Sequence, residues 1–263
     1  MVWRMEHDQY LDLLADETAR LVRVAATAPA DATVPSCPQW RTPDLLWHLA
    51  EVQYFWSRIA GGVQDPEDVP DLARPGDDTV LPQVLEEQTL ALLHPLRHRA
   101  PDEWCWSWND DGEYIGWVAR RQAHEALIHR VDAELVAGVP VVEPDAILAV
   151  DGVDELLREF LDGVPEWGTF TADGRSARIV AEDTAHTWSL RFGRFTGTSP
   201  NTGRTFDEDA LQVVADEPTA DLTVTGRAWD LDRWLWGRGE AEVLRIDGDA
   251  DLATRLRAIA SIE

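Results

Sequence analysis

The sequence contains no lysine, and all 23 of its basic residues are arginines. Schiff-base catalysis and pyridoxal phosphate both need a lysine amine, and the phosphate-binding P-loop motif contains a lysine. The absence of lysine therefore excludes Schiff-base catalysis, attachment of pyridoxal phosphate and a P-loop phosphate site. The richness in arginine, alanine, aspartate and valine suggests a bacterial genome of high GC content.

Cysteine is almost as scarce, because Cys37 and Cys105 are the only two in 263 residues. Two cysteines build neither a disulfide framework nor a thiolate zinc cluster. We expect each to be a small thiol, buried or half-buried, and not a nucleophile.

Positive charge is outnumbered, and long apolar runs are missing. The 23 basic and 49 acidic residues give a formal charge of −26. Such a surface repels phosphate backbones and anionic lipid, so we expect neither nucleic acid nor a membrane as partner. No apolar run approaches the roughly 18–20 residues that span a bilayer, and the charged N-terminus shows no signal-peptide pattern. These absences predict a cytoplasmic protein.

Hydrophobic residues are plentiful at 44%, and the 13 tryptophans favour a packed globular protein. Apolar residues at three- and four-residue spacing, with capping signals, predict four helices over about 5–28, 42–61, 81–99 and 115–138. The proline-rich segment 29–41 reads as a loop. Four such helices predict a bundle in the first half of the chain.

The pattern changes after Pro144. One more helix is expected over 145–163, and strand-like runs follow. The expected strands cover 167–172, 177–182, 187–192, 220–226 and 242–246, and the expected helices cover 229–236 and 249–262. Helices first and strands later predict an α+β protein of two domains, 1–144 and 145–263.

Two short segments carry side chains with metal-binding chemistry. Glu125 and His129 are four residues apart on one predicted helix, so both reach the same point in space. His48 lies on the core-facing side of another helix, and bundles build metal sites between such helices. Two histidines and one carboxylate hold a divalent ion while leaving coordination positions open. His124 points about 100° away from Glu125 and is the weaker ligand.

The same residues also allow a purely structural interpretation. A core histidine is usually a hydrogen-bonded structural group, Glu125 can pair with Arg121, and His129 can face solvent. If a metal binds, either Glu51 or Asp132 lies one turn from a ligating histidine and can orient its second nitrogen. Spacing alone leaves both interpretations open.

The sequences of three segments resemble the mycothiol-dependent maleylpyruvate isomerase family of actinobacteria. They are Val34–Trp40, Thr42–Leu49 and Arg121–Ala133, and the run Ala220–Arg238 is similar to the second domain of that family. The resemblance implies a DinB-like four-helix metal-binding N-terminal domain. It also implies a smaller α/β C-terminal domain that is similar to sterol carrier proteins.

The resemblance implies an enzyme in which His48, Glu125 and His129 hold zinc or another divalent metal. The metal activates a low-molecular-weight thiol, mycothiol, for isomerisation of a small electrophile or for S-transfer to it. The family also uses arginines to hold substrate carboxylates. Arg74, Arg227 and Arg238 are the candidate anion anchors, and an ordinary surface arginine is the alternative for each.

We therefore expect a zinc-dependent, mycothiol-using isomerase or transferase that is a monomer or a weak dimer. A non-catalytic metal-binding or ligand-binding stress protein is the first alternative. A metal-dependent hydrolase on the same bundle is the second. Metal analysis, followed by thiol-consumption and hydrolysis assays, separates the three.

Overall fold

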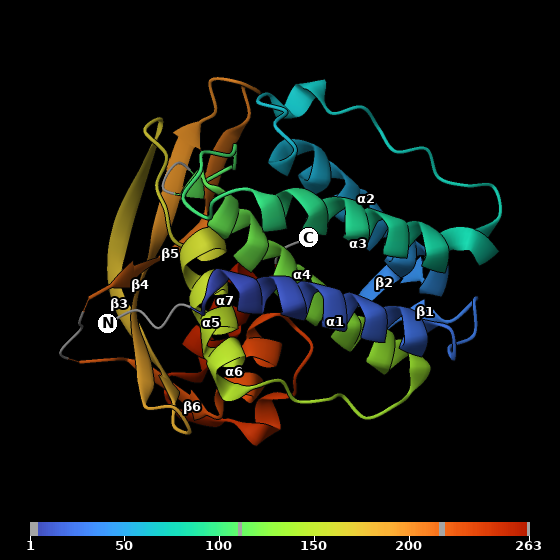
Figure 1. Ribbon diagram of the computed structural model, residues 1–263. Helices are drawn as coiled ribbons and strands as arrows, with labels where there is room; N and C mark the ends of the chain where they lie inside the picture. Colours follow the sequence, from blue (N-terminus) through green and yellow to red (C-terminus); the bar gives the residue numbers. More distant parts are fainter. Residues whose placement is uncertain (1–4, 110–111, 216–218, 262–263) are drawn as a thin grey trace. The chain divides into compact units, whose positions relative to one another are not determined.

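The computed structural model describes residues 5–109, 112–215 and 219–261. Two compact units divide the chain between Val142 and Glu143, close to the change expected after residue 144. The first unit holds the long helices and the second holds the large sheet (Figure 1). The expected α+β fold is thereby confirmed. No helix in the described ranges is long and apolar enough to cross a bilayer.

Four long helices make up the N-terminal unit. They are α1 (His7–Ala25), α2 (Thr42–Ala60), α3 (Leu81–His98) and α4 (Ile115–Ala137). α1 packs against α4 and α2 packs against α3, with further contacts between α1 and α3 and between α2 and α4. Short 3-10 turns at Pro66–Asp68 and Asp78–Val80 lie in the connection from α2 to α3.

The start of α2 positions His48. Thr42 and Pro43 open the helix, and the Asp44 carboxylate accepts the backbone N–H of Arg41 at 2.9 Å. Proline suits the first turn because the missing N–H has no partner there, and an acid meets the positive end of the helix dipole. The buried face of α2 then places His48 at its edge, partly open to solvent.

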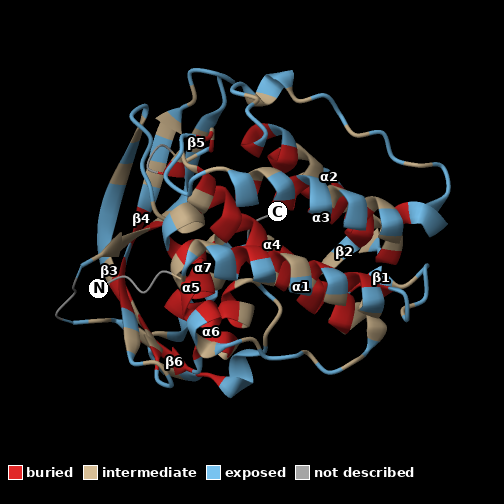
Figure 2. Cartoon of the chain, in the orientation of Figure 1, coloured by how far each residue is buried: buried red, intermediate tan, exposed pale blue. Residues whose placement is uncertain are grey.

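α4 is buried on nearly all sides from Ile115 to Glu134 (Figure 2). On a helix without a solvent face, each polar side chain needs a hydrogen-bond or ion-pair partner within the protein. Arg130, only 1% exposed, donates to Glu17 at 2.7 Å and to Glu134 at 2.6 Å. The helix ends at Gly138, whose φ of 67° is the left-handed conformation that favours glycine.

The segment 29–41 contains a small hairpin, so the prediction of a plain loop was wrong there. β1 (Thr33–Val34) pairs antiparallel with β2 (Cys37–Arg41). Strands of two and five residues are too short to show a reliable alternation of apolar and polar side chains. The hairpin carries Ser36 and Trp40.

The C-terminal unit is a five-stranded sheet in the order β5-β4-β3-β6-β7. The strands are β3 (Gly168–Ala181), β4 (His186–Thr198), β5 (Thr205–Val214), β6 (Leu222–Gly226) and β7 (Arg245–Gly248). β6 is parallel to β3 and the other pairings are antiparallel. The helical segments are α5 (Ala146–Glu155), a π-helical turn (Leu156–Leu161), α6 (Ala228–Leu235), a 3-10 turn (Ala241–Val243) and α7 (Ala250–Ile259).

Two details of this sheet differ from expectation. The runs 167–172 and 177–182 belong to one strand, β3, whose register shifts between Ala172 and Ser176 instead of turning back. β5 was not expected, because its acidic residues obscure the alternation of a strand. β5 lies at the edge of the sheet, where charged side chains are normal.

Candidate metal centre

His48, Glu125 and His129 come together between α2 and α4. Helical spacing had placed Glu125 beside His129, and His48 reaches them from the other helix. The Nε2 atom of His48 lies 3.3 Å from Oε1 of Glu125, and Nε2 of His129 lies 3.2 Å from the same oxygen. One ligand atom from each residue falls within 4.8 Å of the others. Two imidazole nitrogens and a carboxylate oxygen at this separation fit around a single divalent cation.

The three side chains differ in their exposure to solvent. The side chain of His48 is 32% exposed, that of Glu125 is 15% exposed and that of His129 is 8% exposed. His48 therefore lies on the solvent-facing side of the cluster. His129 lies at its buried end.

Asp132 holds the second nitrogen of His129. Its Oδ2 atom lies 2.8 Å from Nδ1 of His129, and its Oδ1 atom accepts the hydroxyl of Ser36 from the hairpin. Because a carboxylate can only accept, the proton between them sits on Nδ1 of the imidazole. This tautomer leaves Nε2, which faces Glu125, as the nitrogen that can ligate. The sequence offered Glu51 and Asp132 as acids that can orient a histidine. The structure pairs Asp132 with His129.

Trp40 packs against both imidazoles. Its ring centroid lies 4.5 Å from that of His48 and 5.8 Å from that of His129. The indole shields this side of the cluster from water and fixes the two rings. Sequence reasoning missed the part played by Trp40 and Ser36, because a two-strand hairpin gave no recognisable pattern.

Arg121 lies one turn before Glu125 and pairs with its second oxygen, Oε2. The structural interpretation had anticipated this ion pair. It leaves Oε1 directed at the two histidines, so the pair and a metal-binding role do not compete for the same atom.

The charges of the cluster interact strongly. Burial disfavours the ionised form of Glu125, but Arg121 and His129 outweigh it and hold the pKa of this carboxyl well below its usual range. Burial likewise disfavours the charged form of His129, but Glu125 and Asp132 outweigh it and raise the pKa of the imidazole to about 9. Two carboxylates thus surround one imidazolium, and a divalent cation would replace its positive charge.

The other candidate residues have partners of their own. His124 is buried, and its ring lies 6.3 Å from that of Tyr10. Arg74 donates to Asp44 at 2.7 Å and to Asp78 at 3.0 Å. Arg227 binds the carboxylate of Glu143 with two nitrogens, and Arg238 donates to the carbonyl of Trp236 at 2.6 Å.

Comparison with known proteins gives matches over most of the chain. A family model described as the mycothiol maleylpyruvate isomerase N-terminal domain matches residues 11–134. A model described as the MDMPI C-terminal domain matches residues 148–255. The sequence has no significant match among curated proteins.

Two solved structures resemble the fold. One is a crystal structure of the mycothiol-dependent maleylpyruvate isomerase, with a TM-score of 0.60 and 13% identity. The other is a histidine-to-alanine mutant of the same enzyme, with a TM-score of 0.61 and 12% identity. Each match covers 92% of this chain and 93% of the other. With both halves matched by the two models, the chain belongs to the mycothiol-dependent maleylpyruvate isomerase family, which is a family of enzymes.

Proposed function

We propose that the protein is a metal-dependent enzyme that uses a low-molecular-weight thiol to isomerise a small unsaturated acid such as maleylpyruvate, or to transfer the thiol to a related electrophile. The observation that carries this proposal is the convergence of His48, Glu125 and His129 on one point. The family membership supports mycothiol as the thiol.

The donor set fits zinc. Three protein donors of the N, O and N type leave at least one position of a tetrahedral ion for a small molecule. The chemistry that a bound divalent cation supplies here is stabilisation of a deprotonated thiol near neutral pH. The chain has no lysine, and burial raises the pKa of the Cys105 thiol to about 11, so this thiol is a poor nucleophile.

The side chains around the cluster perform separate tasks. Asp132 and Ser36 fix the orientation of His129, and Arg121 holds Glu125 in its ionised form. Trp40 shields one side of the imidazoles from water, while the exposure of His48 leaves a path for the thiol. In the isomerisation, the thiol sulfur adds to a carbon of the double bond, the new single bond rotates, and expulsion of the same sulfur restores the double bond. Nothing is consumed.

The test begins with metal content and ends with turnover. Protein purified without chelators is expected to contain about one zinc per chain, and His129→Ala is expected to lose it. His98→Ala removes an exposed histidine of α3 and serves as the matched control, with zinc unchanged. Zinc-loaded protein is then assayed for isomerisation of maleylpyruvate with mycothiol, for thiol consumption with other electrophiles, and for hydrolysis of esters and amides.

Each result has a distinct meaning. Isomerisation or thiol consumption that is lost in His129→Ala supports the proposal. Hydrolysis without a thiol requirement would replace it with the metal-dependent hydrolase. A metal-loaded protein that is inactive in all assays would favour a binding protein, and a protein that never binds metal would remove the proposed chemistry.

A further inference from the structure

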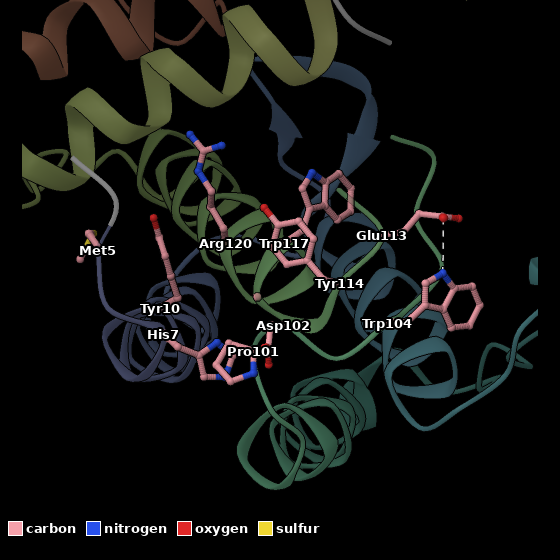
Figure 3. Close-up of a pocket in the computed structure, with 11 residues that line it drawn as sticks. Met5, His7, Tyr10, Pro101, Asp102, Trp104, Glu113, Tyr114, Trp117 and Arg120 are labelled. Atoms are coloured by element: carbon pink, nitrogen blue, oxygen red, sulfur yellow. Dashed lines mark hydrogen bonds between the residues drawn. The ribbon is translucent and has the colours of Figure 1, made fainter. Parts of the chain in front are cut away.

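A cavity of about 590 Å³ lies in the N-terminal unit (Figure 3). It is lined by the start of α1, the segment that follows α3, and the first turns of α4. None of His48, Glu125 and His129 is among its lining residues in the described part of the chain. Its volume is typical of sites that enclose a small molecule.

Four aromatic rings line the cavity. Tyr10 and Trp117 are 4% and 3% exposed and form the deep part of the cavity, whereas Trp104 is 47% exposed and stands at its mouth. Tyr114 adds a fourth ring. Such a set of rings binds a flat apolar group, and the faces of tryptophan and tyrosine also attract a cation.

One end of the cavity offers a hydrogen-bond acceptor that no donor of the described residues meets. Nε2 of His7 lies 2.8 Å from the carbonyl oxygen of Leu96, so Nε2 carries the proton. Nδ1 of the neutral imidazole then presents a lone pair. This atom is buried and has no hydrogen-bond partner among the described residues. A buried acceptor of this kind needs a donor, which a water or a bound ligand can supply.

Carboxylates reinforce this acceptor character. Asp102 lies in the wall at the same end as His7, and Glu113 accepts the indole N–H of Trp104 at 3.3 Å (Figure 3). Arg120 is the one guanidinium among the described lining residues, and in Figure 3 its charged group points away from His7 and Asp102. The formal charge of −26 on the chain adds a field that attracts cations.

We propose that this cavity binds a small aromatic ammonium compound. The ring lies among Tyr10, Trp104 and Trp117, and the ammonium group is directed toward His7 and Asp102. The cavity shares no residue with the cluster, so this proposal does not rest on the proposed metal chemistry.

The test uses three probes with one ring and different charges: benzylamine, benzyl alcohol and benzoate. Dissociation constants are measured on the full chain by ligand-observed NMR titration. Benzylamine is expected to bind at least about fivefold more tightly than benzyl alcohol, and benzoate is expected to bind most weakly. Equal or tighter binding of benzoate would overturn the proposal.

Variants locate the site. Trp104 is at an exposed position, and Trp104→Ala is expected to raise the dissociation constant of benzylamine by at least about threefold. Asp102→Asn is expected to reduce the preference for the amine over the alcohol. The matched control Glu86→Gln removes an exposed carboxylate of α3 outside the cavity and is expected to change neither value.

An amine can also ligate zinc, so the titration is repeated with His129→Ala. Benzylamine binding that is retained in this variant supports the cavity. Loss of binding in His129→Ala, or unchanged binding in Trp104→Ala, would place the amine elsewhere and refute the inference.

Discussion

At the scale of single residues, His129 is where a proton and the proposed metal would compete for the same nitrogen. Its imidazole has a pKa of about 9 because Glu125 and Asp132 both contact it, in spite of its burial. Zinc can bind only after one proton leaves. We therefore expect zinc affinity to rise about tenfold per pH unit between about pH 6 and about pH 8. A competition titration against a chelator of known proton affinity measures this slope.

The raised pKa of His129 also affects the folding stability of the metal-free protein. Higher pH favours zinc binding but lowers this stability. The folded pKa of about 9 lies above the ordinary value of 6.5, so the contribution of His129 to stability is complete below about pH 6.5. It is lost as the pH rises from there toward 9. The zinc titration also tests the starting state of this residue. A zinc affinity that does not change between about pH 6 and about pH 8 would show that His129 is not protonated in the metal-free protein.

Asp132 gives the second prediction at this scale. Asp132→Asn keeps the size of the side chain but loses the charge that holds the Nδ1 proton of His129. We expect zinc affinity to fall about 10- to 100-fold. The control is Asp68→Asn, which removes an exposed aspartate from the connection between α2 and α3. Equal zinc affinities in the two variants would show that Asp132 does not orient the ligand.

Gln122 places a buried amide inside the N-terminal unit. It is 1% exposed, and neither its Oε1 nor its Nε2 atom has a hydrogen-bond partner among the described residues. Leaving such a group unsatisfied costs about 1–3 kcal/mol. We expect Gln122→Met, which is similar in shape, to raise the free energy of unfolding by about 1 kcal/mol. Urea unfolding with an unchanged m-value tests this, and a loss of stability would show that the amide is satisfied in solution.

At the scale of secondary-structure elements, the end of α4 depends on one glycine. Gly138 has a φ of 67°, and no heavy atom lies within 4 Å of the position of an added Cβ. Strain in the backbone alone should therefore decide the effect of Gly138→Ala, at about 1 kcal/mol of lost stability. Gly76→Ala is the control, because Gly76 has equal space and no positive φ. Thermal unfolding of the two variants should differ accordingly.

The elements also show what the sequence can reveal. α2 and α4 were predictable from their length and their boundary signals, since Thr42 and Pro43 open α2 and Gly138 ends α4. Helical spacing then placed Glu125 beside His129. The hairpin was not predictable, since its strands have two and five residues. Ser36 and Trp40 reach the cluster from this hairpin, so the surroundings of the site depend on tertiary contacts that local pattern does not encode.

At the scale of the whole molecule, the charge of −26 dominates. Like charges repel most in the compact state, and dissolved salt screens them. We expect the melting temperature to rise when sodium chloride increases from about 0.02 M to about 0.5 M, where the screening length falls several-fold. A neutral osmolyte at equal osmolality is the control. A melting temperature that falls with salt would show that the arginine–carboxylate pairs outweigh the net repulsion.

One helix serves both sites. Tyr114, Trp117 and Arg120 of the aromatic cavity lie at or near the beginning of α4, and Glu125 and His129 follow on the same rod. Glu125 comes five positions after Arg120, which is about 7.5 Å along the axis at about 1.5 Å per residue. If α4 moves as a rigid helix, its cavity-lining side chains and its cluster side chains move together. A molecule that displaces α4 at the cavity therefore changes the distance from Glu125 to His48, so that amine occupancy and zinc affinity would report on each other through one coupling free energy.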